Sequence, residues 1–289
     1  MKSIENNHFF GRRYLPFKKN ISGFTLLELV IVIIILGVIS VGIAGFIKLT
    51  TQTYLNVTER DELLANSRFV VERLNREIRN AVPNSIRVKN INAMHCIEFV
   101  PIIASSTYID IPVAPELPRT TISAIPFNDQ NGNPYRCNGC NDKVIVYPLL
   151  PTDVYDDYND LTGKVFNVGN FSSAALNQWT IPISNGSVVF NDDSPTERFY
   201  IANNQISYCL FGNRIYRYDN AIGGIQGTPP DANNSLMAEY LATLDASNLP
   251  FTVIPATLTR NAMVQVNLHF TRDNEDYVFN HDIHINNIP

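Results

Sequence analysis

The chain has 289 residues, a formal net charge of −5 and 45% hydrophobic residues. This hydrophobic share is too high for a disordered chain, and the 14 glycines and 17 prolines follow no repeat, which excludes a collagen-like or linker-only chain. The acidic balance argues against a dedicated nucleic-acid binder, because phosphate recognition needs a surplus of lysine and arginine. The charge is uneven: residues 1–23 carry a net +4, and the rest of the chain carries −9.

An uncharged apolar segment of 19 residues runs from Leu29 to Ile47. As a helix it is roughly 28 Å long, about the thickness of the hydrocarbon core of a bilayer. A buried core helix would keep one polar face, whereas this segment has only Ser40 and three glycines, so we expect it to span a membrane. The basic residues before it place the N-terminus in the cytoplasm by the positive-inside rule. A cleaved secretory signal has a shorter apolar core, of about 7–15 residues, so this longer segment is not expected to be one.

Glu28 is the only charged residue between Phe24 and Ile47. An unpaired carboxylate inside a membrane costs on the order of a few kcal/mol, so such an acid indicates a function and a partner. The alternative is that Glu28 reaches the lipid headgroups without a specific partner.

The residues on either side of Glu28 carry a family resemblance. Lys18 to Gly23, followed by Phe24 and the apolar run, resembles the class III signal of type IV prepilins and type II secretion pseudopilins. The resemblance implies that a prepilin peptidase cuts after Gly23 and methylates the new amine of Phe24. It also implies that Glu28 is the assembly carboxylate. We expect Glu28 to set subunit register by pairing with the Phe24 amine of its own or a neighbouring subunit.

The same resemblance implies where the protein acts and with what. The expected partners are the prepilin peptidase, other major and minor pilins, the inner-membrane pilus assembly platform and, before assembly, the lipid bilayer. No cofactor is expected. The expected location is the bacterial inner membrane, with a single span and a periplasmic head, and then the pilus at the cell surface. One departure is Gly45, which stands where major pilins usually carry a helix-kinking proline. With Gly37 and Gly42 it either lets the helix stretch locally or forms contacts with neighbouring helices.

A second helical pattern covers residues 59–82. Its apolar side chains fall within roughly a 120° stripe, and charged residues lie on the other side. The stripe consists of Leu63, Leu64, Val70, Val71, Leu74, Ile78 and Ala81. Pro83 ends the pattern, so we predict one helix over 24–82, transmembrane at about 29–47 and amphipathic over 48–82. The resemblance implies that the leader before it, residues 1–23, is removed. Phe69 lies on the charged side, as a stray apolar residue or a subunit contact.

Residues 83–289 form the predicted head, which is long enough for a single sizeable core. Strand patterns occur at 96–100 and 143–147, in a three-stranded meander (197–202, 205–210, 214–218) and in a C-terminal hairpin (263–270, 277–285). Segments rich in Pro, Asn, Asp and Ser predict surface loops at 101–142, 148–178 and 222–235. The predicted fold class is α+β, a long helix packed on an antiparallel β-sheet, as in type IV pilins.

The resemblance continues into the head. Residues 67–88, 96–102, 207–220 and 281–289 resemble minor pilins of the PilW type, especially those of the mannose-sensitive haemagglutinin (MSHA) pilus system. The match is weak across the predicted loops, where ligand specificity would differ.

Four cysteines in an exported domain predict disulfides. We favour Cys137–Cys140, in a polar loop with a tight Asn-Gly turn, together with Cys96–Cys209, whose members lie on predicted strands. The alternative is one zinc ion held by four thiolates, although the second CxxC motif typical of zinc sites is missing.

Other candidate sites are weaker. His281 and His284 would point to opposite faces of a strand, so they do not form a metal pair. The acidic segment 153–160 could supply oxygen ligands for calcium but lacks EF-hand spacing, so a solvated loop is the preferred interpretation. Because no catalytic motif is apparent, we expect no enzymatic activity. The sequence favours a minor pilin in or at the tip of a fibre. The alternatives are a J-type pseudopilin of type II secretion and an adhesin head.

Overall fold

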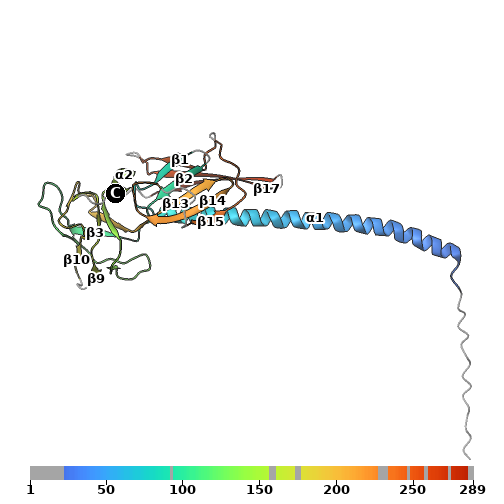
Figure 1. Cartoon of the computed structure of the whole chain (residues 1–289). Coiled ribbons are helices and arrows are strands. Elements are labelled where there is room, and N and C mark those ends of the chain that lie inside the picture. The colour runs from blue at the N-terminus through green and yellow to red at the C-terminus, as the bar shows by residue number, and fades with distance from the viewer. Residues whose placement is uncertain are drawn as a thin grey trace, which may run out of the picture. The chain divides into compact units, whose positions relative to one another are not determined.

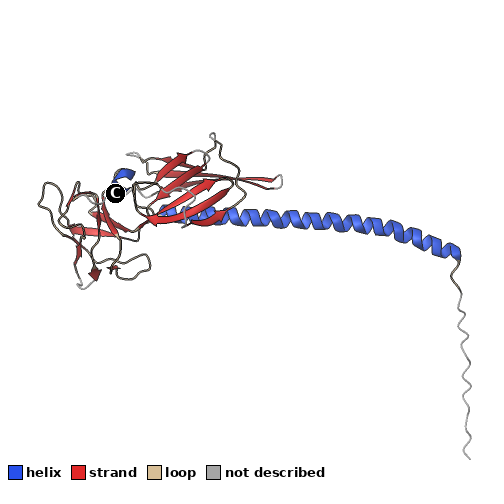
Figure 2. Ribbon diagram, viewed as in Figure 1, coloured by secondary structure: helices blue, strands red, loops and turns tan. Residues whose placement is uncertain are grey.

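The computed structural model describes residues 23–91, 94–155, 161–172, 177–226, 234–245, 248–256, 260–272 and 275–285. The predicted leader, apart from Gly23, lies outside these residues. The chain divides into two compact units, Met1–Glu59 and Arg60–Pro289. A single helix, α1 (Leu26–Arg79), contributes to both units, and the second unit is built mainly of antiparallel strands (Figure 1, Figure 2). The α+β fold class is therefore confirmed.

In the first unit, α1 has no partner within the described chain. Every residue from Gly23 to Thr58 is exposed, including the whole apolar run. The helix is continuous through Gly37, Gly42 and Gly45, and a Cβ atom added to any of the three would meet nothing within 4 Å. This part of α1 is long and apolar enough to cross a membrane.

In the second unit, α1 buries one stripe of side chains. The fully buried positions are Leu63, Ser67, Val70, Leu74 and Ile78, which confirms the predicted amphipathic stripe. The helix ends at Arg79, three residues earlier than predicted, because the backbone turns to pair with the residues after the second strand. Val82 donates its N–H to the carbonyl of Val100 (2.8 Å), and Ile102 donates to the carbonyl of Asn80 (2.9 Å).

Two antiparallel sheets supply the first core with α1. The five-stranded sheet has the order β1 (Arg87–Ile91), β2 (Met94–Phe99), β13 (Asn204–Phe211), β14 (Arg214–Ala221) and β15 (Asn234–Ala238). The three-stranded sheet has the order β16 (Phe251–Ile254), β17 (Met263–Arg272) and β18 (Glu275–His284). Side chains of both sheets and of α1 form one buried cluster. The predicted C-terminal hairpin is confirmed as β17–β18.

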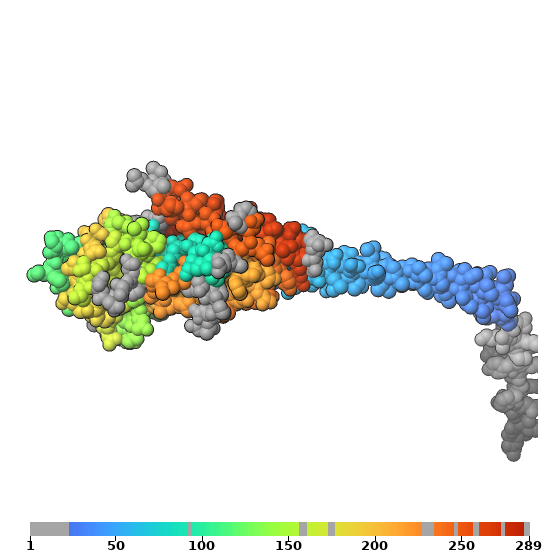
Figure 3. All heavy atoms as spheres, turned by 45° about the horizontal axis from the view of Figure 1, so that its top comes forward, coloured from blue at the N-terminus to red at the C-terminus, as the bar shows by residue number. Residues whose placement is uncertain are grey.

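Residues 101–203 form an inserted lobe between two strands that are neighbours in the five-stranded sheet. β2 and β13 pair with Ile206 opposite Phe99. The chain between them builds a six-stranded sheet in the order β10 (Trp179–Pro182), β4 (Thr121–Ala124), β3 (Ala104–Asp110), β12 (Arg198–Ala202), β6 (Lys143–Val146) and β8 (Val165–Asn167). In the space-filling view, this green-to-yellow lobe and the orange-to-red C-terminal strands lie at opposite ends of the head (Figure 3).

The inserted lobe contradicts the predicted surface loops at 101–142 and 148–178. Besides the strands of the six-stranded sheet, these segments contain β5 (Arg136–Cys137), β9 (Phe171–Ser172), β7 (Thr162–Gly163) and the short helix α2 (Pro151–Tyr155). β5 pairs with β9, and β7 pairs in parallel with β11 (Val189–Phe190). The lobe has its own buried cluster, drawn from residues 104–201. The head therefore contains more than one core.

The predicted three-stranded meander was wrong in the pairing of its first strand, although that strand, β12, is present. β13 and β14 form a hairpin, as expected, but β12 pairs with β3 and β6 in the other sheet. Only Asn203 separates β12 from β13, and one residue is too short for a hairpin turn, which needs at least two. The chain therefore passes from one sheet into the other.

Candidate functional site

The predicted cleavage site is open. Gly23 and Phe24 are both exposed, Phe24 at 79% of its surface. A Cβ atom at Gly23 would meet nothing within 4 Å, and the backbone there does not require glycine. The packing of this chain therefore does not explain why residue 23 is a glycine. A peptidase that must approach the backbone closely would explain it, because glycine has no side chain in the way.

Glu28 lies in the first turn of α1, directly after a helix cap. The hydroxyl oxygen of Thr25 accepts a hydrogen bond from the backbone N–H of Glu28 (3.3 Å), and the carbonyl of Thr25 accepts one from Leu29 (3.2 Å). Thr25 is thus the N-cap, and Glu28 stands at the third helical position, as in a capping box. We missed this cap in the sequence, although Thr-x-x-Glu before an apolar run is its usual signal.

The cap places Glu28 in the first turn of α1, four residues after Phe24, whose amine a cut after Gly23 would free. Phe24 directly precedes the cap residue, and the helix N-terminus carries unpaired N–H groups and the positive end of the helix dipole. An acid in the first turn is stabilised by both. Removal of residues 1–23 would add the ammonium of Phe24 at the same end, so the local structure gathers positive charge around one carboxylate.

Comparison with protein families finds the prokaryotic N-terminal methylation motif over residues 18–44. This match covers the predicted cleavage site, the cap, Glu28 and most of the apolar run. The chain carries a prepilin-type N-terminus. The motif supports a type IV pilin or pseudopilin subunit that is anchored in a membrane, processed by prepilin peptidase and assembled with other pilins. Comparison with curated proteins and with solved structures gives no match.

In the head of this prepilin-type chain, Glu77 ties the end of α1 to the five-stranded sheet. Its carboxylate accepts hydrogen bonds from Arg73 Nε (3.0 Å), from the hydroxyl of Tyr208 on β13 (2.8 Å) and from Arg217 Nε on β14 (3.1 Å). Burial, and then the neighbouring Glu77, raise the pKa of Tyr208 well above its usual value. The i,i+4 spacing of Arg73 and Glu77 is visible in the sequence, whereas Tyr208 and Arg217 are distant along the chain and could not be predicted as partners.

The four cysteines form the two disulfides that the sequence favours. Cys96 and Cys209 are directly opposite each other on β2 and β13, both fully buried, with Cα atoms 4.1 Å apart. Cys137 and Cys140 close the Asn-Gly turn. No cysteine is free, so no thiolate remains for zinc.

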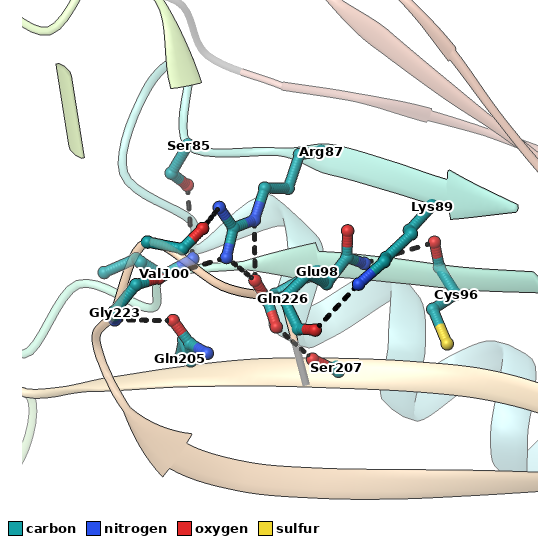
Figure 4. Close-up of polar contacts among 11 residues, drawn as sticks. Ser85, Arg87, Lys89, Cys96, Glu98, Val100, Gln205, Ser207, Gly223 and Gln226 are labelled. Atoms are coloured by element: carbon teal, nitrogen blue, oxygen red, sulfur yellow. Dashed lines mark hydrogen bonds and ion pairs between the residues drawn. The ribbon is translucent and has the colours of Figure 1, made fainter. Parts of the chain in front are cut away.

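A fully buried charge lies on β2, next to the edge strand β1 of the same sheet, and was not predicted. Glu98 is fully buried and accepts hydrogen bonds from Arg87 Nε (2.7 Å) and from the hydroxyl of Ser207. The same Arg87 donates to the carbonyl of Gly223 (3.1 Å), which Figure 4 labels, and to the carbonyl of Gly224 (2.9 Å). The pair therefore pins the segment after β14 onto the sheet. This agrees with the rule that a buried charge is paired.

The weaker candidate sites gain no support. His281 and His284 both lie on β18, where residues three apart face opposite sides. Asp153 lies in α2, where it accepts hydrogen bonds from the N–H groups of Leu149 (2.8 Å) and Leu150 (3.1 Å). Residues 156–160 of the acidic segment lie outside the described residues. Within the described part of the chain, no cluster of three or more His, Cys, Asp or Glu residues could hold a metal ion.

Proposed function

We propose that this chain is a minor pilin of an MSHA-like type IV pilus, of the PilW type and closest to MshO. In this proposal it is a non-enzymatic structural subunit, cut after Gly23, methylated at Phe24 and inserted in or at the tip of the fibre. There it contributes to pilus biogenesis and surface adhesion. The observation that carries the proposal is the capped helix start with its single carboxylate inside the methylation motif.

The inserted lobe supports a minor rather than a repeating subunit. It adds the six-stranded sheet and a second core between two neighbouring strands, so the head is bulkier than a helix packed on the five- and three-stranded sheets alone. A subunit in or at the tip of the fibre has no neighbouring subunit above its head. The inserted lobe therefore does not clash with a neighbour there. The lobe is also where a surface ligand would be met, since inserted segments commonly carry specificity.

Glu28 is the assembly residue in this proposal, and its substitution tests the role. Glu28→Gln keeps the size and removes the charge, and Asp61→Asn serves as a matched control on the exposed part of α1 outside the apolar run. We expect Glu28→Gln to be processed and found in the membrane but lost from sheared fibres, with Asp61→Asn unchanged. Equal amounts of both variants in fibres would refute the role.

The runner-up is a J-type pseudopilin of a type II secretion system, which the helix and antiparallel sheets fit equally well. The two functions differ in where the chain ends up and what its loss affects. A minor pilin is recovered from sheared surface fibres, and its deletion reduces piliation and attachment. A pseudopilin is absent from that fraction, and its deletion stops secretion of the type II substrates.

A further inference from the structure

The edge strands of the head are not protected equally. At the edges of the five- and six-stranded sheets, β1 has five residues and carries Lys89, β15 has five residues and pairs through a bulge, β10 has four residues and ends in Pro182, and β8 has three. β18 is ten residues long, contains no proline or lysine, and pairs with β17 in one unbroken register. Short length, bulges and proline protect a sheet edge from pairing with other chains. β18 has none of these three features, and its protection is limited to the charges of Glu275, Asp276 and Asp282.

The hydrogen-bond pattern shows which backbone groups of β18 point outward. Ile285, just after the strand, donates its N–H to Ala262 beside β17 (3.0 Å), whereas Thr271 of β17 donates away from β18, to Tyr240 (2.7 Å). Because such bonds alternate along an antiparallel pair, the even-numbered residues of β18 direct their N–H and C=O groups outward. These residues are Asp276, Val278, Asn280, Asp282 and His284. Within the described chain, nothing hydrogen-bonds to their outward backbone groups.

The side chains of β18 define what would fit beside it. The even-numbered residues form an exposed face with two carboxylates, Asp276 and Asp282, and with Val278 at 54% exposure. Asp276 also lies 3.3 Å from Nε2 of His269. On the other face, Tyr277 and Phe279 are half-buried and pack against the first core. The strand carries three carboxylates and no lysine or arginine.

We propose that β18 is a docking edge to which an extended segment of a partner protein adds as a fourth strand of the β16–β17–β18 sheet. Backbone pairing along the outward groups would supply affinity, and the side chains would supply selectivity. The segment carries lysine or arginine opposite Asp276 and Asp282, since opposite charges on facing residues stabilise a strand pair. On its other face it carries apolar residues that extend the packing of Tyr277 and Phe279. This inference does not depend on the pilus role.

A labelled peptide tests the edge directly on the full-length chain in detergent. The probe has ten residues, with lysine at positions one and seven, threonine at the other odd positions and valine at the even positions. Its partner peptide carries glutamate in place of lysine. We expect fluorescence anisotropy to show that the lysine peptide binds at least about tenfold more tightly. Equal binding of the two peptides, or no binding of either, would overturn the proposal.

Two variants link binding to β18. Asn280→Pro removes one outward N–H without touching the β17 ladder, and Asn280→Thr keeps it. We expect about tenfold weaker binding for the proline variant alone. If Asn280→Pro does not fold, the double substitution Asp276→Lys and Asp282→Lys replaces it and should reverse the preference toward the glutamate peptide. An unchanged preference, or pairing of two copies through β18 that excludes the peptide, would contradict the proposal.

Discussion

Glu77→Ala should be among the most damaging single substitutions in the head. The carboxylate holds three donors, and two of their side chains have little access to water: Tyr208 is fully buried and the Arg217 side chain is 13% exposed. Breaking a buried charge pair costs about 3–5 kcal/mol, and a hydrogen bond to a charged group is worth about 1.5–3 kcal/mol. Because the Glu77 side chain is itself 16% exposed, we expect Glu77→Ala to lower the free energy of unfolding by about 3 kcal/mol, the lower end of this range. We expect Tyr208→Phe to lower it by about 1.5 kcal/mol.

The assay must separate the two cores of the head. Trp179 is the only tryptophan and lies in the core of the inserted lobe, so its fluorescence reports unfolding there. Hydrogen exchange over residues 63–78 reports the first core. In urea, Glu77→Ala should lower the exchange protection of 63–78 and leave the fluorescence transition nearly unchanged. In the double variant Glu77→Ala/Tyr208→Phe, the loss in unfolding free energy should be smaller than the sum of the two single-variant losses by about 1 kcal/mol. Strict additivity would refute the proposed contact.

Three further outcomes are expected. Replacing Cys96 and Cys209 by alanine should lower the unfolding free energy by up to about 5 kcal/mol, and replacing Cys137 and Cys140 by about 2 kcal/mol, because the first disulfide closes a loop of 113 residues and the second a loop of 3. Equal losses in denaturation curves would contradict this. Burial lowers the pKa of His95 in the folded state, so the imidazole is protonated in the unfolded state first, and the free energy of unfolding should fall as the pH drops below about 6.5. An equally steep pH dependence in His95→Gln would contradict this. Replacing residues 101–203 by a two-residue turn should leave a folded helix–sheet core in which the Cys96–Cys209 bond still forms, as mass spectrometry would show; free thiols there would count against an independent lobe.

The helix could be predicted from the sequence because its signals are local. The uncharged run and the spacing of residues such as Leu63, Val70 and Leu74 define α1 and its buried stripe without reference to the rest of the chain. The C-terminal hairpin is similarly local, since β17 and β18 alternate over ten residues each and follow one another closely along the chain.

The inserted lobe could not be predicted in this way. Its strands are mostly short and are separated by segments that contain proline, and they pair with distant partners: Ala104 of β3 lies opposite Ile201 of β12. Short strands have too few residues to show a period, so composition alone indicated loops. The contacts of Glu77 and Glu98 depend on the same long-range pairing, which places Tyr208 and Ser207 beside these acids. The Thr25 cap was local and predictable from its spacing to Glu28.

The most direct test of the account is the mass of the mature N-terminus. The protein is purified from cells with and without prepilin peptidase, and its N-terminal peptide is analysed by mass spectrometry. The account predicts a chain that begins with N-methylated Phe24 when the peptidase is present, and an uncut chain that keeps Gly23 and the basic leader when it is absent. A mature chain that begins at Met1 in cells with an active peptidase would contradict it.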